Sequence, residues 1–387
     1  MKYIGMILFF SIFISIYFAG NFYVLNRGLQ ALPHISWLKI GYKIIFIFLS
    51  LAFIISRFTG YSSFITLHHV LTWFGSFWLA AVVYFLIAVA VFDLFRLINL
   101  GFHFLPATDS IGYLKLKLFV FLITVISVGI TLIFGYFNAT HPQVKTLDLD
   151  VNKSQNASSL KIVAVSDIHL GPLVGKNMLE LLVKMVNQQK PDIIILAGDI
   201  LDESQESIIR EDTGNPLRKF HAPLGVYAVV GNHEYIGGIS SAIKYIQSLN
   251  ITILRDSVVE INNSFFLIGR DDHGMGRGSN KTRKPLNELV MNVDKSKPLI
   301  LIDHQPYNLQ DAVNNGIDLQ ISGHTHNGQF WPFNYLIQNI FELSWGYKRK
   351  VNTHFYVSSG YGTWGPPVRI GNRSEIVVLN LNFDKEK

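Results

Sequence analysis

The chain of 387 residues contains no cysteine, and this absence removes two kinds of chemistry. Without thiols the protein has no disulfide bonds, and a metal site in it cannot use thiolate ligands. The absence is compatible with a location outside the cytoplasm but does not prove one. The sequence also has no internal repeat and no low-complexity segment.

What the chain does have is an excess of apolar residues. Hydrophobic residues make up 49% of the sequence, and the mean hydropathy is +0.30. Such a composition is too apolar for a soluble chain unless part of it lies in lipid. Each crossing of a bilayer needs ~20 apolar residues. We predict four transmembrane helices, at Tyr3–Asn26, Ile40–Phe58, Leu71–Phe92 and Leu118–Phe137. The second of these contains Lys43, which can extend its charge to the interface.

The distribution of basic residues predicts the orientation of these helices. Six lie in the first and third loops, namely Arg27, Lys39, Lys43, Arg96, Lys115 and Lys117. Three lie near the helix ends on the other side, namely Lys2, Arg57 and Lys145. Because cytoplasmic loops collect Lys and Arg, we expect a multi-pass cell membrane protein whose remaining domain lies outside the cytoplasm. The net charge of +6 is attributed to such loops, so no nucleic-acid partner is predicted.

Two further regions follow the transmembrane region 1–137. Residues 138–159 are polar and are interpreted as a linker, with an edge strand at Val144–Asp150 as one option. Residues 160–387 alternate apolar runs of strand length with helical segments such as Lys176–Gln189 and Ile239–Leu249. This alternation is typical of an α/β domain.

The first apolar run of this domain ends in two possible metal ligands. Ile162–Val165 reads as a buried strand, and Asp167 and His169 follow it. Residues two apart at a strand end project to the same side, so both side chains can reach one ion. Taken alone the pattern is weak, since a capping Asp beside a solvated His would look the same.

Four further apolar runs end in the same way. Their terminal residues are Gly198-Asp199, Gly231-Asn232-His233-Glu234, Asp303-His304 and Gly323-His324-Thr325-His326. Ligands of open α/β sheets gather at the carboxyl ends of the strands. Five such endings with carboxylate, amide and imidazole side chains therefore predict one shared metal site.

In this order the five endings resemble the calcineurin-like metallophosphoesterase family, over roughly residue 160 to the C-terminus. The segments Ser322–Gln329 and Tyr361–Gly371 are similar to those of its bacterial membrane-associated phosphodiesterase branch. Asn327 stands where that branch more often has Gly. The resemblance implies two stacked mixed β-sheets flanked by helices, with a two-metal site at the strand ends.

The resemblance also implies roles for single residues. The expected ligands are Asp167, His169, Asp199 and His326 for one ion, and Asp199, Asn232, His304 and His324 for the other. His233 would assist the leaving oxygen, with Glu234 orienting its imidazole. For Asp202 two interpretations stay open, a residue that supports the ligands from behind or a helix cap. The cofactors implied are two divalent ions of Mn, Zn or Fe, which together can hold and acidify an attacking water.

The sequence therefore predicts a membrane-anchored metal-dependent phosphoesterase. Because the site is tethered to a bilayer, we expect a phosphodiester or pyrophosphate of a lipid-linked substrate, attacked by hydroxide held on the ions. Two alternatives remain, namely a phosphoesterase acting on soluble nucleotides or phosphoproteins, and a catalytically silent binding or sensory protein with this fold.

An aromatic-rich segment directly after His326 bears on the substrate. In Phe330–Lys350 one helical face carries Leu336, Ile337, Ile340, Phe341 and Leu343. Interfacial aromatics and basic residues are also present, namely Trp331, Trp345, Tyr347, Lys348, Arg349 and Lys350. We predict a lip that enters the outer leaflet, and the alternative is an amphipathic helix packed on the domain.

Overall fold

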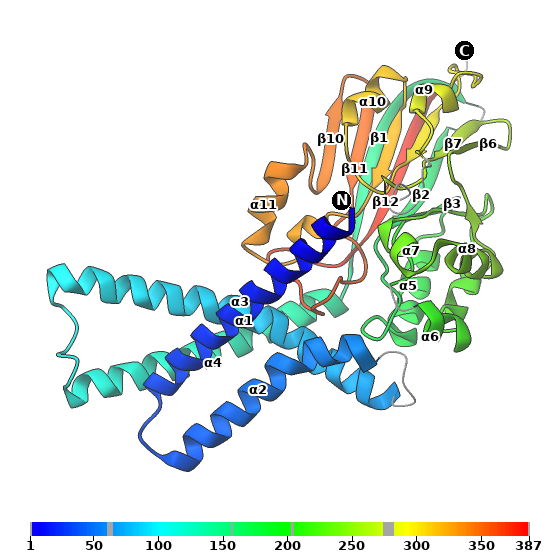
Figure 1. Ribbon diagram of the computed structural model, residues 1–387. Helices are drawn as coiled ribbons and strands as arrows, with labels where there is room; N and C mark the ends of the chain where they lie inside the picture. The colour runs from blue at the N-terminus through cyan, green and yellow to red at the C-terminus, as the bar shows by residue number, and fades with distance from the viewer. Residues whose placement is uncertain (1, 60–64, 156–157, 203–204, 274–281, 386–387) are drawn as a thin grey trace. The chain divides into compact units, whose positions relative to one another are not determined.

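The computed structural model describes residues 2–59, 65–155, 158–202, 205–273 and 282–385 (Figure 1). The chain divides into two compact units, residues 1–135 and residues 136–387. Each unit has its own apolar cluster.

The N-terminal unit consists of long helices. They are α1 (Lys2–Ala31), α2 (Ser36–Thr59), α3 (Ile65–Phe102) and α4 (Ile111–Thr140), the last of which continues into the second unit. Among the described residues, three helical stretches are long and apolar enough to cross a membrane: Ser36–Thr59, Thr66–Phe102 and Ile111–Thr140. These include the predicted span that contains Lys43. The helix at Tyr3–Asn26 is present within α1, and its crossing of the membrane stays a prediction.

Close packing of α2 on α3 holds this unit together. A side chain at Gly75 would lie 2.3 Å from the backbone nitrogen of Phe53, so only glycine permits this approach. The rings of Phe46 and Trp78 meet edge to face at 4.8 Å. The indole nitrogen of Trp78 donates a hydrogen bond to Asn21 Oδ1 at 2.9 Å, so its polar atom is satisfied inside the unit.

Two six-stranded mixed sheets form the C-terminal unit. In order across the first sheet the strands are β1 (Gln143–Gln155), β12 (Glu375–Lys385), β2 (Ser159–Val165), β3 (Ile193–Ala197), β4 (Val226–Val229) and β5 (Thr252–Ile253). In order across the second they are β10 (Gly346–Lys350), β11 (Thr353–Val357), β9 (Leu319–Ser322), β8 (Leu299–Ile302), β7 (Phe265–Gly269) and β6 (Ser257–Ile261). The run β2–β3–β4–β5 is parallel, and so is the run β7–β8–β9–β11.

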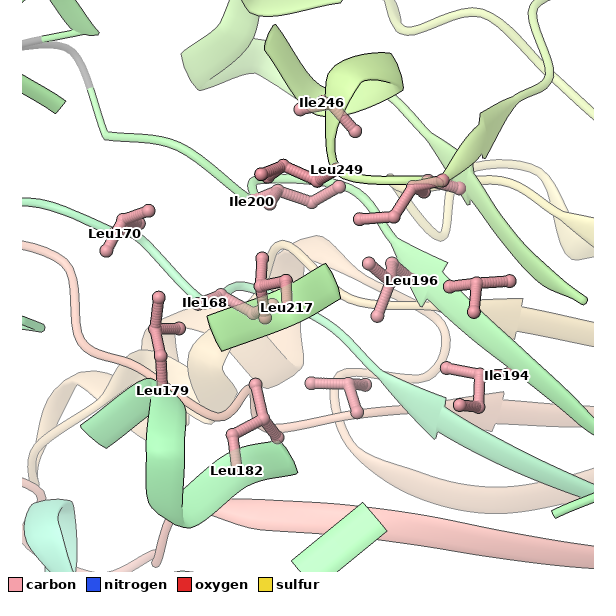
Figure 2. Packing of buried hydrophobic residues seen from close by; sticks show 14 of the residues in the cluster. Ile168, Leu170, Leu179, Leu182, Ile194, Leu196, Ile200, Leu217, Ile246 and Leu249 are labelled. Atoms are coloured by element: carbon pink, nitrogen blue, oxygen red, sulfur yellow. The ribbon is translucent and has the colours of Figure 1, made fainter. Parts of the chain in front are cut away.

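Alternation along the strands distributes side chains between two cores. In β2, Ile162 and Ala164 belong to the cluster shared by both sheets, whereas Val163 and Val165 belong to the cluster beneath the helices. Successive strand residues point to opposite faces, so a strand that is apolar throughout is covered on both. Figure 2 shows the helix-side core, in which Leu179 and Leu182 of α5 (Lys176–Gln188) belong to one cluster with Ile194 and Leu196 of β3.

Short helices cover both outer faces. On the first sheet they are α5, α6 (Gln205–Arg210), η1 (Asn215–Lys219), α7 (Asn232–Gly237) and α8 (Ile239–Ser248). The outer face of the second sheet packs on α9 (Leu286–Leu289) and α10 (Leu309–Asn314), through Leu286 and Leu309 against Leu299 and Leu301. The predicted α/β fold of two stacked mixed sheets is confirmed.

The segment interpreted as a linker contains regular structure. Within residues 138–159, α4 ends at Thr140 and β1 begins at Gln143. β1 lies at the edge of the first sheet and pairs in parallel with β12, Val144 opposite Ile376. The edge strand that the sequence left open is therefore longer than expected.

Candidate metal centre

Strand topology brings the predicted ligands to one place. β2, β3 and β4 are parallel neighbours in the first sheet, and β8 and β9 are parallel neighbours in the second. Contacts between the loops after these strands join the two sheets: the amide of His324 donates to both oxygens of Asp167, at 2.9 and 3.1 Å. His304 also reaches across, since its Nδ1 lies 2.7 Å from the Ala197 carbonyl oxygen.

One group of ligand atoms consists of Asp167, His169 and His326. Their nearest oxygen and nitrogen atoms all lie within 4.8 Å of one another, and all three side chains are buried. The Nε2 atoms of His169 and His326 are 3.0 Å apart, and His326 Nε2 lies 3.4 Å from Asp167 Oδ1. Two imidazoles and a carboxylate aimed at a common point are a fitting donor set for a divalent ion.

A second group consists of Asp199, His304 and His324. Asp199 Oδ2 lies 3.2 Å from His304 Nε2 and 3.8 Å from His169 Nε2, so this oxygen faces both groups. Asn232 Oδ1 and His304 Nε2 are buried and have no hydrogen-bond partner among the described residues. Unsatisfied buried acceptors are costly, and a metal ion held here would satisfy both.

The backbone is left-handed at most of these positions. Asp167, His169, Asp199, His324 and His326 have φ between +47° and +71°. Non-glycine residues seldom occupy this region, and such strain is concentrated at functional sites. The turns after the strands thus direct side chains to a shared point rather than along the sheets.

Glycines beside the ligands make room for this convergence. A Cβ at Gly231 would lie 2.2 Å from Asp199 Oδ1, and a Cβ at Gly323 would lie 2.3 Å from Asp167 Oδ2. Any side chain at either position would displace a ligand. The recurrence of Gly before Asp, Asn and His at the strand ends therefore has a steric cause.

Hydrogen bonds behind the ligands orient them. When the Nδ1 of His304 donates to Ala197, its Nε2 is left to face Asp199. The backbone amide of His233 donates to Asp199 Oδ1 at 2.9 Å, which leaves Oδ2 for the shared position.

Glu234 and Asp202 both lie at the site, and they contact different groups. Glu234 is fully buried and accepts from the amides of Gly231, Leu201 and Asp199, at 2.7, 2.8 and 3.2 Å. It thereby ties the turn after β3 to the turn after β4. The carboxylate beside the His233 imidazole is Asp202, whose Oδ1 lies 3.1 Å from Nδ1.

Burial determines the protonation of two imidazoles of the site, those of His169 and His324. It lowers the pKa of His169 to about 4, and together with the nearby His304 it lowers the pKa of His324 to about 3. Both are therefore neutral at pH 7, the form that binds metals. Burial opposes ionisation of Asp199, but the imidazole of His304 outweighs it and holds the Asp199 pKa well below its usual range.

Arg369 is a functional residue that the pattern did not single out. It is completely buried, and its Nη2 donates to the Gly360 carbonyl at 3.1 Å and lies 3.3 Å from His326 Nδ1. The only signal in the sequence was its place within the segment Tyr361–Gly371. The buried guanidinium of Arg369 restrains the imidazole of His326 and makes the electrostatic potential of the site more positive.

The backbone conformation at position 327 explains why Asn can stand there in place of Gly. It lies in η3 (His326–Gly328) with φ +48° and ψ +40°, a left-handed conformation. Glycine adopts this conformation most readily, and Asn tolerates it better than most residues. The departure from the family pattern thus preserves the turn that carries His326.

Comparison with known proteins agrees with this geometry. The family model of the calcineurin-like phosphoesterases matches residues 160–328. An uncharacterized metallophosphoesterase of Aquifex aeolicus (strain VF5) is 31% identical over 241 residues, which cover 62% of this chain and 91% of that protein. The chain belongs to the calcineurin-like metallophosphoesterases. It is a metal-dependent phosphoric ester hydrolase of that family, and its His and Asp clusters fit two divalent ions.

Other relatives of this metallophosphoesterase bear on the membrane. A Bos taurus protein described as a transmembrane protein with a metallophosphoesterase domain is 35% identical over 291 residues, covering 69% of this chain and 62% of that protein. An uncharacterized metallophosphoesterase of Campylobacter jejuni is 33% identical over 275 residues, covering 69% and 71%. The three apolar helices of this chain are long enough to cross a membrane, and together with the Bos taurus relative they indicate a membrane protein.

The predicted lip is only partly exposed. Phe341 is buried, its ring 4.8 Å from that of Tyr307 and 6.0 Å from that of His324. Trp345 is half-buried and donates to Glu375 Oε1 at 3.2 Å. The expectation that these two side chains face lipid is therefore wrong, because both are packed inside the domain.

The helix that precedes Phe341 is more exposed. None of the residues of α11 (Phe333–Ile340) is buried, and α11 packs on η3, which carries the ligand His326. Tyr335, Leu336 and Ile340 are each more than half exposed. An apolar helix face thus lies uncovered beside the metal centre within the same unit.

Proposed function

We propose that this metallophosphoesterase holds two divalent ions and hydrolyses a phosphodiester or pyrophosphate bond of a lipid-linked substrate. The observation that carries the two-ion site is the position of Asp199, whose Oδ2 faces both ligand groups. When bound, the ions lower the pKa of a water molecule and neutralise phosphoryl oxygens. Six further residues complete the two sets of ligands, namely Asp167, His169, His326, Asn232, His304 and His324.

His233 is proposed to give a proton to the leaving oxygen. Its imidazole stands 4.5 Å from that of His169, measured between ring centres, and Asp202 anchors its Nδ1. Of the two ring nitrogens, Nε2 is the one proposed to give the proton to the substrate. A ring nitrogen of His233 also lies within 4.8 Å of the ligand atoms of His169 and Asp199. The alternative role for His233 is therefore that of a metal ligand. Metal retention in His233→Ala separates the two roles.

The lipid-linked substrate is supported by α11 and by the membrane helices. An uncovered apolar face next to the ligand His326 suits a substrate whose phosphate lies at a bilayer surface. A soluble nucleotide makes no use of such a face, and a silent binding protein has no need of the strained ligand positions.

A paired assay tests the substrate class. Leu336→Ser with Ile340→Ser should reduce turnover of a vesicle-embedded phosphodiester several-fold and leave a soluble nitrophenyl phosphodiester unaffected. Met291→Ser is the control, because Met291 is 73% exposed but lies in another part of the domain. Equal losses on both substrates would reject the lipid proposal, and absence of hydrolysis on any phosphoester would favour the binding-protein alternative.

The side of the membrane is also a proposal. We infer that the catalytic unit lies outside the cytoplasm, from the excess of Lys and Arg in the first and third loops. A cysteine at the exposed position Met291 should react with an impermeant maleimide on intact cells, and one at the exposed loop position Thr108 should not. The reverse labelling would place catalysis in the cytoplasm.

A further inference from the structure

The N-terminal unit encloses a cavity that the hydrolase activity does not use. Its volume is about 450 Å³, within the ~300–1,000 Å³ usual for ligand sites. All four helices contribute to its wall, and every lining residue falls between Val24 and Val125. No predicted metal ligand is among them.

One part of the wall is apolar. Phe46 and Leu49 come from α2, Trp78 and Phe85 from α3, and Phe121 from α4. The polar atom of Trp78 is already bonded to Asn21, so this part offers little to a polar ligand. It suits a hydrocarbon chain.

Other residues of the wall are cationic. Arg27, Arg96 and Lys117 line the cavity together with a single carboxylate, Asp93. They belong to the last turns of α1 and α3 and the first turns of α4, so they lie at the same end of these antiparallel helices. Charges among transmembrane helices are costly and usually serve a ligand or a partner.

Asp93 does not neutralise this end. It accepts from Arg27 Nη2 at 2.5 Å and from Arg96 Nη1 at 3.2 Å, so two guanidinium groups share one carboxylate. Arg27 Nε is buried without a hydrogen-bond partner among the described residues. Lys117 Nζ lies 5.4 Å from the centre of the Tyr113 ring and has no carboxylate at ion-pair distance in the described part of the chain. A net positive charge therefore remains at the cavity.

We propose that this cavity binds one anionic phospholipid of the surrounding bilayer. An acyl chain fills the apolar part between the helices, and the phosphate meets Arg96, Lys117 and the free Nε of Arg27. Basic pockets between transmembrane helices are the recognised means by which headgroups are held, and guanidinium–phosphate contacts supply the strength. The proposal is independent of the substrate proposed above, because it requires neither metal ions nor turnover.

The test measures lipid retained by the purified full-length chain in native mass spectrometry. Detergent-solubilised protein is incubated with dioleoyl phosphatidylglycerol or dioleoyl phosphatidylcholine at equal concentration. The wild-type chain should retain one phosphatidylglycerol in preference to phosphatidylcholine. Arg96→Gln with Lys117→Gln should lower the retention of phosphatidylglycerol roughly tenfold, the loss expected when charged contacts to a phosphate are removed.

A matched pair controls for net charge. Lys39→Gln with Lys115→Gln removes two positive charges from the same loops but touches no lining residue, so it should retain phosphatidylglycerol like the wild type. Ala88→Phe fills the apolar part and should abolish retention of both lipids. Unchanged circular dichroism and an unchanged melting transition in detergent show for each variant that the helices of the N-terminal unit have folded.

Three results would overturn the proposal. Equal retention in the cavity pair and the control pair would show that general charge, not the cavity, attracts the lipid. Equal retention of the two lipids by the wild type would remove the anionic preference. Unchanged retention in folded Ala88→Phe would place the lipid elsewhere.

Discussion

Around the metal centre, ionisable side chains are enclosed, whereas in the N-terminal unit large apolar side chains lie exposed along the helices. Asp167 and Glu234 have no exposed surface, while Phe22 and Ile133 are about 70% exposed. In the first region these carboxyl groups accept from backbone amides, Glu234 from three and Asp167 from that of His324. In the second, lipid replaces water as the solvent, so outward apolar residues need no cover. Substitutions around the metal centre should therefore change metal content or turnover strongly. Substitutions in the N-terminal unit should chiefly change thermal stability.

The largest effect is expected at Asp199. Because its Oδ2 faces both ligand groups, Asp199→Asn should lower the metal content well below two ions per chain and abolish turnover. His326→Ala should chiefly remove one ion, since His326 belongs to one group alone. Elemental analysis of the purified variants makes the comparison. Normal metal content and turnover in Asp199→Asn would contradict the shared role.

The next effect separates proton transfer from metal binding. His233→Ala should keep its ions but lose turnover by the ~10²–10⁴-fold typical of a general acid. Substrates with good leaving groups should lose less, because they need little protonation. Equal losses for nitrophenyl and alkyl diesters would argue against a leaving-group role, and a lost ion would make His233 a ligand.

A smaller effect is expected at Asp202, which positions His233. Asp202→Asn should reduce turnover ~10–100-fold, as removal of a residue that orients a catalytic group usually does. The loss should show the same dependence on the leaving group as His233→Ala. Asp212→Asn is the control, since this carboxylate pairs with Arg218 instead. A uniform loss across leaving groups would indicate a merely structural role.

The smallest effect on catalysis is expected from packing in the N-terminal unit. Gly75→Leu forces α2 from α3 and should lower thermal stability in detergent, by the ~1–3 kcal/mol typical of overpacking. Gly129→Leu should not, since no atom lies within 4 Å of the added Cβ. Both variants should hydrolyse a soluble diester normally. A loss of that activity in Gly75→Leu alone would show that the two units are coupled.

The sequence predicted which His and Asp side chains lie close together, because apolar runs and polar endings alternate in a regular pattern. An apolar run followed by a polar ending determines where a side chain emerges, and parallel pairing of β2 with β3 then brings Asp167 and Asp199 together. A contact between loops adds His324 from the second sheet. The same reasoning found the α/β fold and the helices near Ile40–Phe58 and Leu118–Phe137.

Contacts that join distant segments were beyond this reasoning. No local pattern distinguishes Asp202 from Glu234 as the partner of His233, because the choice depends on how two turns meet. The inward packing of Phe341 depends on Tyr307, 34 residues earlier. The contact between Arg369 and His326 is recognised only once the fold places the two residues side by side.

The central claim, a pair of ions that share Asp199, is tested most directly by electron paramagnetic resonance of the Mn²⁺-loaded wild-type chain. We expect two Mn²⁺ per chain and the spectrum of an exchange-coupled pair, because a bridging carboxylate holds such ions ~3.5–4 Å apart. A single Mn²⁺ at saturation, or two ions with the spectrum of isolated Mn²⁺, would contradict the account.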